Sequence, residues 1–113
     1  MPPREFEVEL TLAAEKGLAS LNHSEQIQVF KQLEKLKRAP ELGEPLGNKL
    51  GLDLTGYRKM YAAKKRVRVI YEIAGTKLIV TVIAIGPRED ARVYRIASSE
   101  AKNRRLRKIS GGS

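Results

Sequence analysis

The side chains in this sequence that could carry out chemistry are arginine, lysine and tyrosine. The chain of 113 residues has 22 Lys and Arg, four tyrosines, one histidine and no cysteine. A protein without cysteine has no thiol nucleophile, thiolate metal ligand or disulfide. A zinc site needs several His, Cys or acidic ligands, which this chain cannot cluster around His23, and no G-x-x-x-x-G-K phosphate loop is present. We therefore expect neither a metal nor a cofactor.

The remaining residue types suit the cleavage of RNA, which carries its own nucleophile in the 2′-hydroxyl. A ribonuclease of this kind must hold the phosphate in line, offset the developing negative charge and manage two proton transfers. A guanidinium can donate two hydrogen bonds to phosphate oxygens. A tyrosine can stack on a base or take part in proton transfer.

The positive charge lies in the second half of the chain. The net charge is +9. Residues 1–55 hold seven Lys and Arg against nine Asp and Glu, a balance of −2, whereas residues 56–113 hold fifteen against four, a balance of +11. This asymmetry favours a phosphate-rich partner such as nucleic acid. A solvated surface, a membrane or an acidic protein partner would also fit.

The N-terminal sequence MPPREFEVEL does not resemble a signal peptide. Nothing in the chain approaches 18 consecutive apolar residues, the length of a membrane-spanning helix. We expect a soluble protein of the cytoplasm.

Hydrophobic periodicity predicts an α+β fold in one domain, residues 1–113. Arg4–Leu10 alternates apolar and acidic residues, which is typical of a half-buried strand. Two helices should follow, one capped by Thr11 and one opened by Asn22. The second helix carries an apolar stripe that we expect in the core, formed by Ile27, Phe30 and Leu33.

The second half of the sequence predicts strands and a basic end. Pro40–Gly56 is rich in glycine and proline and is interpreted as an extended loop. Three strands are then expected, at Tyr57–Ala62, Arg66–Ile73 and Leu78–Ile85. The last is apolar on both faces and should be central and covered on both sides. With a weak helix over Arg88–Ala101 and a basic tail at about 102–113, the prediction is a strand and two-helix hairpin packed on an antiparallel sheet of about four strands.

Two short motifs in these strands resemble a known family. The sequence R-V-I-Y-E-I at residues 68–73, followed by G-x-R-x-x-x-x-V-Y at residues 86–94, is similar to the core of the RelE/ParE superfamily of toxins from type II toxin–antitoxin systems. The motifs are closest to RelE-like mRNA interferases. The resemblance implies a microbial-ribonuclease-like sheet and a ribosome-dependent endoribonuclease that cuts mRNA in the A site. It also implies partners: a cognate antitoxin, the ribosome and mRNA.

The resemblance also implies a set of catalytic residues. Arg68 matches the arginine that binds the scissile phosphate, Arg88 the arginine that stabilises the leaving group or transition state, and Tyr94 the tyrosine that stacks on or deprotonates the nucleotide. On the preceding strand RelE enzymes carry two lysines two residues apart, and here that pair becomes Arg58 and Met60. We expect Arg58 to contact phosphate on the catalytic face, with the intervening residue pointing away. Further RNA contacts are expected from Lys59, Lys64, Lys65, Arg66, Arg92 and Arg95.

Plainer interpretations of these residues remain open. Arg68 could be an exposed strand arginine, Arg88 an ordinary loop cation and Tyr94 a core aromatic residue. Two other functions also fit the same sequence. One is a ParE-like toxin, which shares the fold but poisons DNA gyrase; the other is a non-catalytic basic module that binds RNA or the ribosome.

Overall fold

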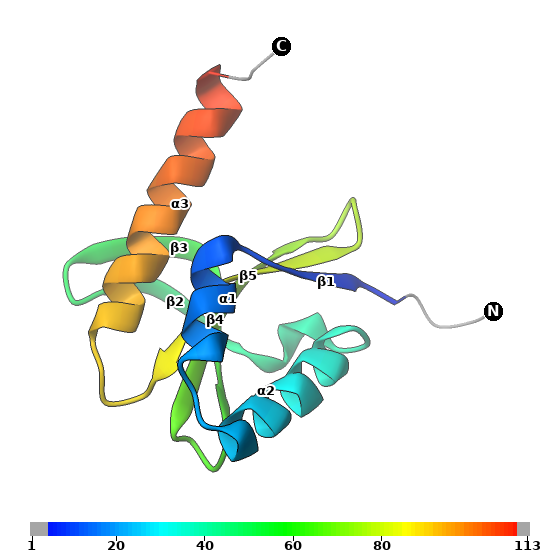
Figure 1. Ribbon diagram of the computed structural model, residues 1–113. Coiled ribbons are helices and arrows are strands. Elements are labelled where there is room, and N and C mark those ends of the chain that lie inside the picture. Colours follow the sequence, from blue (N-terminus) through cyan, green and yellow to red (C-terminus); the bar gives the residue numbers. More distant parts are fainter. Residues whose placement is uncertain (1–4, 111–113) are drawn as a thin grey trace.

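One five-stranded sheet covered by helices on both faces makes up the described part of the chain, residues 5–110 of a computed structural model. The helices α1 and α2 pack on one face and α3 crosses the other (Figure 1). The expected α+β fold is confirmed. In chain order the elements are β1 (Glu7–Leu10), α1 (Leu12–Ala19), α2 (His23–Leu36), the 3-10 helix η1 (Pro40–Leu42), β2 (Glu44–Lys49), β3 (Leu52–Ala62), β4 (Val67–Ala74), β5 (Ile79–Pro87) and α3 (Arg92–Ser110).

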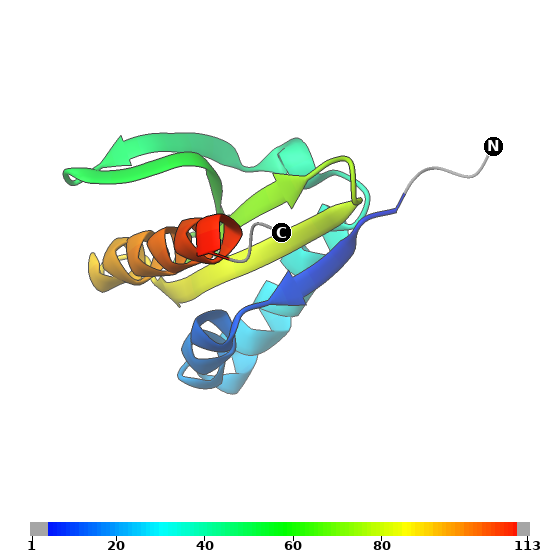
Figure 2. The ribbon, with the colours of Figure 1, turned by 90° about the horizontal axis from the view of Figure 1, so that it is seen from above.

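The strand order across the sheet is β1-β5-β4-β3-β2 (Figure 2). The strand β1 is parallel to β5, and every other pair is antiparallel. The strand β5 therefore lies between two neighbours and under helices on both faces, as its sequence predicts. The strand β5 also contains a β-bulge: Ile70 pairs with Ala84 and Tyr71 pairs with Val82, so Ile83 has no partner on β4. The bulge lets the neighbours Ile83 and Ala84 both pack in the core under α3.

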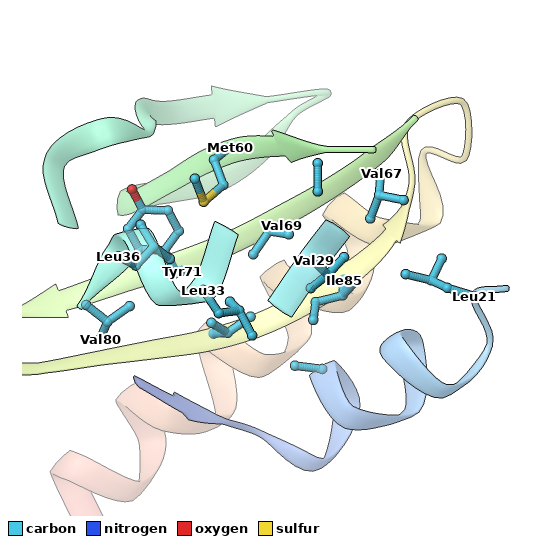
Figure 3. Close-up of a cluster of buried hydrophobic side chains, with 13 residues drawn as sticks. Leu21, Val29, Leu33, Leu36, Met60, Val67, Val69, Tyr71, Val80 and Ile85 are labelled. Carbon is cyan, nitrogen blue, oxygen red and sulfur yellow. The ribbon is translucent and has the colours of Figure 1, made fainter. Parts of the chain in front are cut away.

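Two aliphatic cores lie on opposite faces of the sheet. The core under α1 and α2 includes Val29, Leu33, Leu36, Met60 and Tyr71 (Figure 3). The Tyr71 hydroxyl is satisfied in this core, since it donates to the Pro40 carbonyl at 2.6 Å and accepts from the Gly43 N–H at 2.8 Å. The core under α3 includes Leu54, Tyr57, Ile70, Ile83, Ala84, Val93, Tyr94, Ala97 and Ala101.

The helix starts follow the capping residues in the sequence. The Thr11 side chain accepts a hydrogen bond from the Ala14 N–H, and Asn22 forms a capping box with Glu25. The helix α1 then lies very close to β5: a Cβ on Gly17 would fall 2.0 Å from the Ile85 carbonyl oxygen. Glycine at position 17 is therefore required by packing.

The expectation that Pro40–Gly56 is an extended loop is wrong. This segment contains η1, the strand β2 and the beginning of β3. Leu50 and Gly51, both with positive φ (54° and 74°), form the turn between the two strands. Consecutive positive φ values are typical of the tight turns that match the twist of a hairpin. Gly47, Gly51 and Gly56 are turn and bulge positions inside a hairpin, and the sheet gains a fifth strand.

Two expectations about the helices also need correction. Leu33 is buried, but Ile27 and Phe30 are 41% and 53% exposed, because α2 rests on the sheet through Val29, Leu33 and Leu36 instead. The weak helix expected over Arg88–Ala101 begins only at Arg92, as α3, which continues without interruption through the first part of the expected basic tail. Residues 111–113 of that tail lie outside the described residues.

The close approach of α1 to β5 gives a first prediction. Helix propensity alone would favour Gly17→Ala by up to about 1 kcal/mol. We expect the opposite result, a loss of about 1–3 kcal/mol in the free energy of unfolding, because the new Cβ must push α1 away from β5. Urea denaturation of the variant measures this change.

Gly75→Ala is the matched control. Nothing lies within 4 Å of a Cβ added at Gly75, and its φ is not in the positive range. Its free energy of unfolding should stay within about 0.5 kcal/mol of the unchanged protein. A Gly17→Ala protein as stable as this control would show that α1 is not in tight contact with β5.

Candidate functional site

Lysine, arginine and tyrosine side chains gather on the α3 face of the sheet. The antiparallel register places Tyr61 of β3 opposite Arg68 of β4, and Lys59 lies two residues before Tyr61 on the same strand face. Arg88 follows β5, and Tyr94 comes from the first turn of α3. We call these five residues the basic–aromatic cluster.

Arg68 is the most enclosed member of the cluster. Its residue is only 8% exposed, and its guanidinium carbon lies 4.4 Å from the centre of the Tyr94 ring and 5.9 Å from that of Tyr61. The Nε atom is buried and has no hydrogen-bond partner, and no carboxylate among the described residues forms an ion pair with Arg68. Aromatic faces stabilise a guanidinium only in part. Burial of a cation without a counter-ion is costly, and a bound anion would offset that cost.

Tyr94 is positioned by the start of α3. The Asp90 carboxylate accepts a hydrogen bond from the Arg92 N–H at 2.9 Å and pairs with the Arg92 side chain at 2.7 Å. The Arg92 guanidinium and N–H hold the pKa of Asp90 below its ordinary value, so the carboxylate stays charged. This contact fixes the N-terminal end of α3. Tyr94, which is 4% exposed, then packs against Arg68.

Arg88 reaches the cluster from the segment that follows β5. Its backbone N–H donates to the Arg66 carbonyl at 2.8 Å, which ties this segment to the turn between β3 and β4. Its guanidinium carbon lies 5.5 Å from the centre of the Tyr61 ring. Unlike Arg68, Arg88 is exposed, so its guanidinium can meet a ligand from solvent.

Tyr61 is the residue that sequence reasoning missed, although it lies opposite Arg68 of the first motif. The Lys59 ammonium donates to its hydroxyl at 3.2 Å and lies 5.1 Å from the ring centre. Lys59 is also 3.9 Å from a carboxylate oxygen of the exposed Glu44. The hydrogen bond from Lys59, followed by the neighbouring Arg68, lowers the pKa of the Tyr61 phenol from its ordinary value. The signal in the sequence was its two-residue spacing from Lys59.

The expected assignment of residues to the two faces of β3 is wrong. Arg58 and Met60 point to the face under α1 and α2, and Lys59 points to the Arg68 face. The Arg58 guanidinium donates to the Gly43 carbonyl at 2.7 Å, and Met60 is buried in the core shown in Figure 3. The register explains the difference, because Lys59 is opposite Ile70 and Met60 is opposite Val69. The structure does not bring Arg58 to the cluster, and a lysine at position 60 would place an ammonium among aliphatic side chains.

The other residues expected to bind RNA lie around the cluster. Lys64, Lys65 and Arg66 are exposed in the turn after β3, and with Arg88 they line one hollow. Arg92 is exposed but paired with Asp90, and Arg95 is exposed one turn further along α3. Within residues 5–110 no group of three His, Asp or Glu side chains is arranged to hold a metal ion.

Comparison with known proteins identifies the family. The model for the ParE toxin of the type II toxin–antitoxin system parDE matches residues 8–92. The chain belongs to the RelE/ParE superfamily of toxins. No curated protein matches this toxin. In the described part of the toxin no helix is both long and apolar enough to cross a membrane.

Solved structures of RelE proteins share the fold of this toxin. A double arginine-to-alanine variant of E. coli RelE in the free state is 21% identical, with a TM-score of 0.68 over 84% of this chain and 96% of that chain. For the RelBE2 toxin–antitoxin complex from Mycobacterium tuberculosis the values are 24%, 0.64, 76% and 94%. For the archaeal RelE–RelB complex from Pyrococcus horikoshii they are 17%, 0.59, 77% and 99%.

The burial of Arg68 without a carboxylate gives a second prediction, concerning stability. Replacement by an apolar side chain of similar length, Arg68→Met, removes a desolvated charge. We expect the free energy of unfolding to rise by about 1 kcal/mol, the increase typical of relieving a strained functional site. Chemical denaturation of the purified toxin measures it.

Arg104→Met is the matched control, because Arg104 is an arginine of the same face with a carboxylate partner. Its guanidinium pairs with Glu72 of β4. Loss of this pair leaves a partly buried carboxylate unsatisfied, so the free energy of unfolding should fall by about 1–3 kcal/mol. If the free energy of unfolding changed in the same direction in the two variants, the view that buried Arg68 destabilises the fold would be wrong.

Proposed function

We propose that this toxin is a metal-independent endoribonuclease that cuts mRNA in the ribosomal A site. The observation that carries the proposal is the enclosed Arg68 guanidinium, which has no counter-carboxylate and lies between two tyrosine rings. A phosphodiester supplies the missing negative charge, and its flanking bases supply aromatic faces. Its 2′-hydroxyl supplies the nucleophile, so no bound water or metal ion is needed.

Three side chains of the cluster, Arg68, Arg88 and Tyr94, have a role in such a cleavage. Arg68 binds the non-bridging oxygens of the scissile phosphate through the N–H groups of its guanidinium. Arg88 stabilises the charge that develops on the phosphate and on the 5′ oxygen as that oxygen leaves. This role is electrostatic, since a guanidinium keeps its proton in proteins. The enclosed Tyr94 ring packs on Arg68 and holds its guanidinium in place.

Contacts to the rest of the RNA come from outside the cluster. The turn residues Lys64, Lys65 and Arg66 extend the positive surface from Arg88 along one side, and Arg95 extends it along α3. Such contacts to the phosphate backbone position a nucleic acid without reading its sequence. The ribosome would hold the mRNA in place, because it presents a single extended strand to this face of the toxin.

A second function has a specific observation in its favour. The matching family model describes ParE toxins, and a ParE-like toxin of this fold would poison DNA gyrase. The enclosed arginine and the two tyrosines favour the nuclease, because a gyrase poison has no need of a phosphate site flanked by aromatic rings. Inhibition of gyrase supercoiling by the purified toxin, without mRNA cleavage, would favour the ParE-like function.

The third prediction separates catalysis from binding. Arg68→Ala and Arg88→Ala should each slow single-turnover mRNA cleavage on programmed ribosomes by roughly 10²–10³-fold, the usual effect of losing a preorganised donor. Ribosome binding should change only modestly, because many cations share it. Mapped 5′ ends of the mRNA give the rate, and co-sedimentation with ribosomes gives the binding.

Arg58→Ala is the control for this experiment. Arg58 lies on the opposite face of β3 and hydrogen-bonds the Gly43 carbonyl, so the cleavage rate per folded molecule should be unchanged. If the unchanged toxin cuts mRNA, and Arg68→Ala and Arg88→Ala each cut it as fast as the unchanged toxin does, the cluster is not the active site. If the unchanged toxin binds ribosomes and cuts nothing, it is a binding module.

The fourth prediction concerns a cognate antitoxin. Solved relatives of this fold include the RelBE2 and RelE–RelB complexes, in which a toxin is bound to its antitoxin. We propose that a small antitoxin protein neutralises this toxin by covering or distorting the basic–aromatic cluster. Expression of the toxin alone should arrest growth, Arg68→Ala should relieve the arrest, and the product of the adjacent gene should co-purify with the toxin. Normal growth during expression of the folded toxin alone would contradict the proposal.

A further inference from the structure

The cleavage scheme leaves two titratable groups of the cluster without a role, the Tyr61 hydroxyl and the Lys59 ammonium that donates to it. The hydroxyl lies at the centre of the positive charge, with Lys59 at 3.2 Å from its oxygen and with the guanidinium carbons of Arg68 and Arg88 at 5.9 Å and 5.5 Å from its ring centre. Its residue is partly exposed, whereas Tyr94 is 4% exposed. Of the two tyrosines, Tyr61 is therefore the one that a substrate hydroxyl can reach.

We propose that Tyr61 is the general base of the cleavage reaction and that Lys59 is its positioning residue. This inference rests on the proposed nuclease function. Tyr61 accepts the proton of the 2′-hydroxyl through its phenolate oxygen, and the 2′ oxygen forms a bond to the phosphorus held by Arg68. The bond from phosphorus to the 5′ oxygen breaks, and the leaving oxygen takes a proton from water. The products are a 2′,3′-cyclic phosphate and a free 5′-hydroxyl, and Tyr61 returns its proton to solvent.

The charges that surround Tyr61 are mostly positive. Lys59 of β3, Arg68 of β4 and Arg88 after β5 are all cationic, and Lys35 of α2 lines the same hollow as Tyr61. Glu44 of β2 is the acidic residue on this side, but it is largely exposed and lies next to the Lys59 ammonium. The net positive charge around Tyr61 stabilises its phenolate form, and the pKa of Tyr61 is lowered mainly by the hydrogen bond from Lys59.

The other two tyrosines of the fold cannot replace it. Burial raises the pKa of Tyr57, which lies on the same face of β3 near Glu72 and Arg104. Burial also raises the pKa of Tyr71, whose hydroxyl is engaged with Pro40 and Gly43 in the opposite core. Tyr57 is therefore a matched control: a tyrosine of the same strand face whose pKa is shifted in the opposite direction.

The fifth prediction tests Tyr61 through the pH dependence of cleavage. Because a lowered phenol pKa moves the base into its active form at lower pH, the logarithm of the single-turnover rate should rise with pH and level off below the pKa of an ordinary tyrosine. Tyr61→Phe should slow cleavage by roughly 10²-fold or more, as expected for loss of a general base, and should abolish this rise. Ribosome binding by Tyr61→Phe should be unchanged, and Tyr57→Phe should retain both the rate and the pH profile.

Three further measurements separate a base from a merely structural tyrosine. Lys59→Gln removes the largest cause of the lowered pKa, so its rate profile should shift to higher pH. Incorporation of a fluorinated tyrosine at position 61, whose phenol is more acidic, should shift the profile to lower pH. An ultraviolet titration of tyrosinate in the free toxin, compared with Tyr61→Phe, should show the same direction of shift for Lys59→Gln without any RNA.

The outcomes distinguish the two levels of the proposal. If the unchanged toxin cuts mRNA and Tyr61→Phe cuts with the same rate and the same pH profile, the role of Tyr61 is overturned and the nuclease function stands. If the unchanged toxin does not cut mRNA on ribosomes, the nuclease function is overturned, and the role of Tyr61 with it.

Discussion

The antiparallel register of β3 and β4 is the constraint on which the site depends. The two strands are joined by a turn in which Ala63, Lys64 and Lys65 all have positive φ, between 52° and 67°. Left-handed backbone at non-glycine residues is uncommon, so surrounding contacts must hold it. A change of one residue in register would carry the whole of β3 to the other face. Arg58 and Met60 would then face Arg68, and Lys59 and Tyr61 would lie in the core.

The aliphatic cores on the two faces hold this register in place. Met60 is buried under α1 and α2, and Tyr57 is buried under α3. A slip of β3 by one residue would remove Met60 from its core and bury Lys59 there, and it would remove Tyr57 from its core and bury Arg58 there. The strand β5 supports both cores, with its bulge at Ile83 adding apolar surface to the α3 face. The close contact between Gly17 and Ile85 then fixes α1 against this strand. The cluster is thus positioned by rigid elements that contribute nothing to its chemistry.

The α3 face combines packing and charge at neighbouring positions. Near the start of α3, Tyr94 covers Arg68; further along, Arg104 pairs with Glu72 and Arg105 lies 3.5 Å from a carboxylate oxygen of Asp53. Arg104 and Arg105 in the second half of the helix thus have acidic partners on the sheet, and among the described residues Arg68 beneath its first turn has none. This difference distinguishes arginines that hold the fold together from an arginine available to a ligand. It also implies a cost in stability at Arg68, which is common where a protein preorganises a binding site.

Local patterns determined much of this protein. Alternation identified β1, capping residues identified the starts of α1 and α2, and the apolar run of β5 indicated a strand covered on both faces. The motifs selected Arg68, Arg88 and Tyr94, which the structure brings together. These features depend on neighbours a few residues apart, so a single sequence records them. The tertiary structure decided the strand β2, the exposure of Phe30, and the exchange of Arg58 for Lys59 and Tyr61 at the site. Those outcomes depend on turn conformation and on pairing between distant strands. The positive φ values at Leu50, Ala63 and Lys64 occur at residues other than glycine, so the sequence does not mark these turns. The alternation of side chains along a strand does not say which of its faces meets which partner.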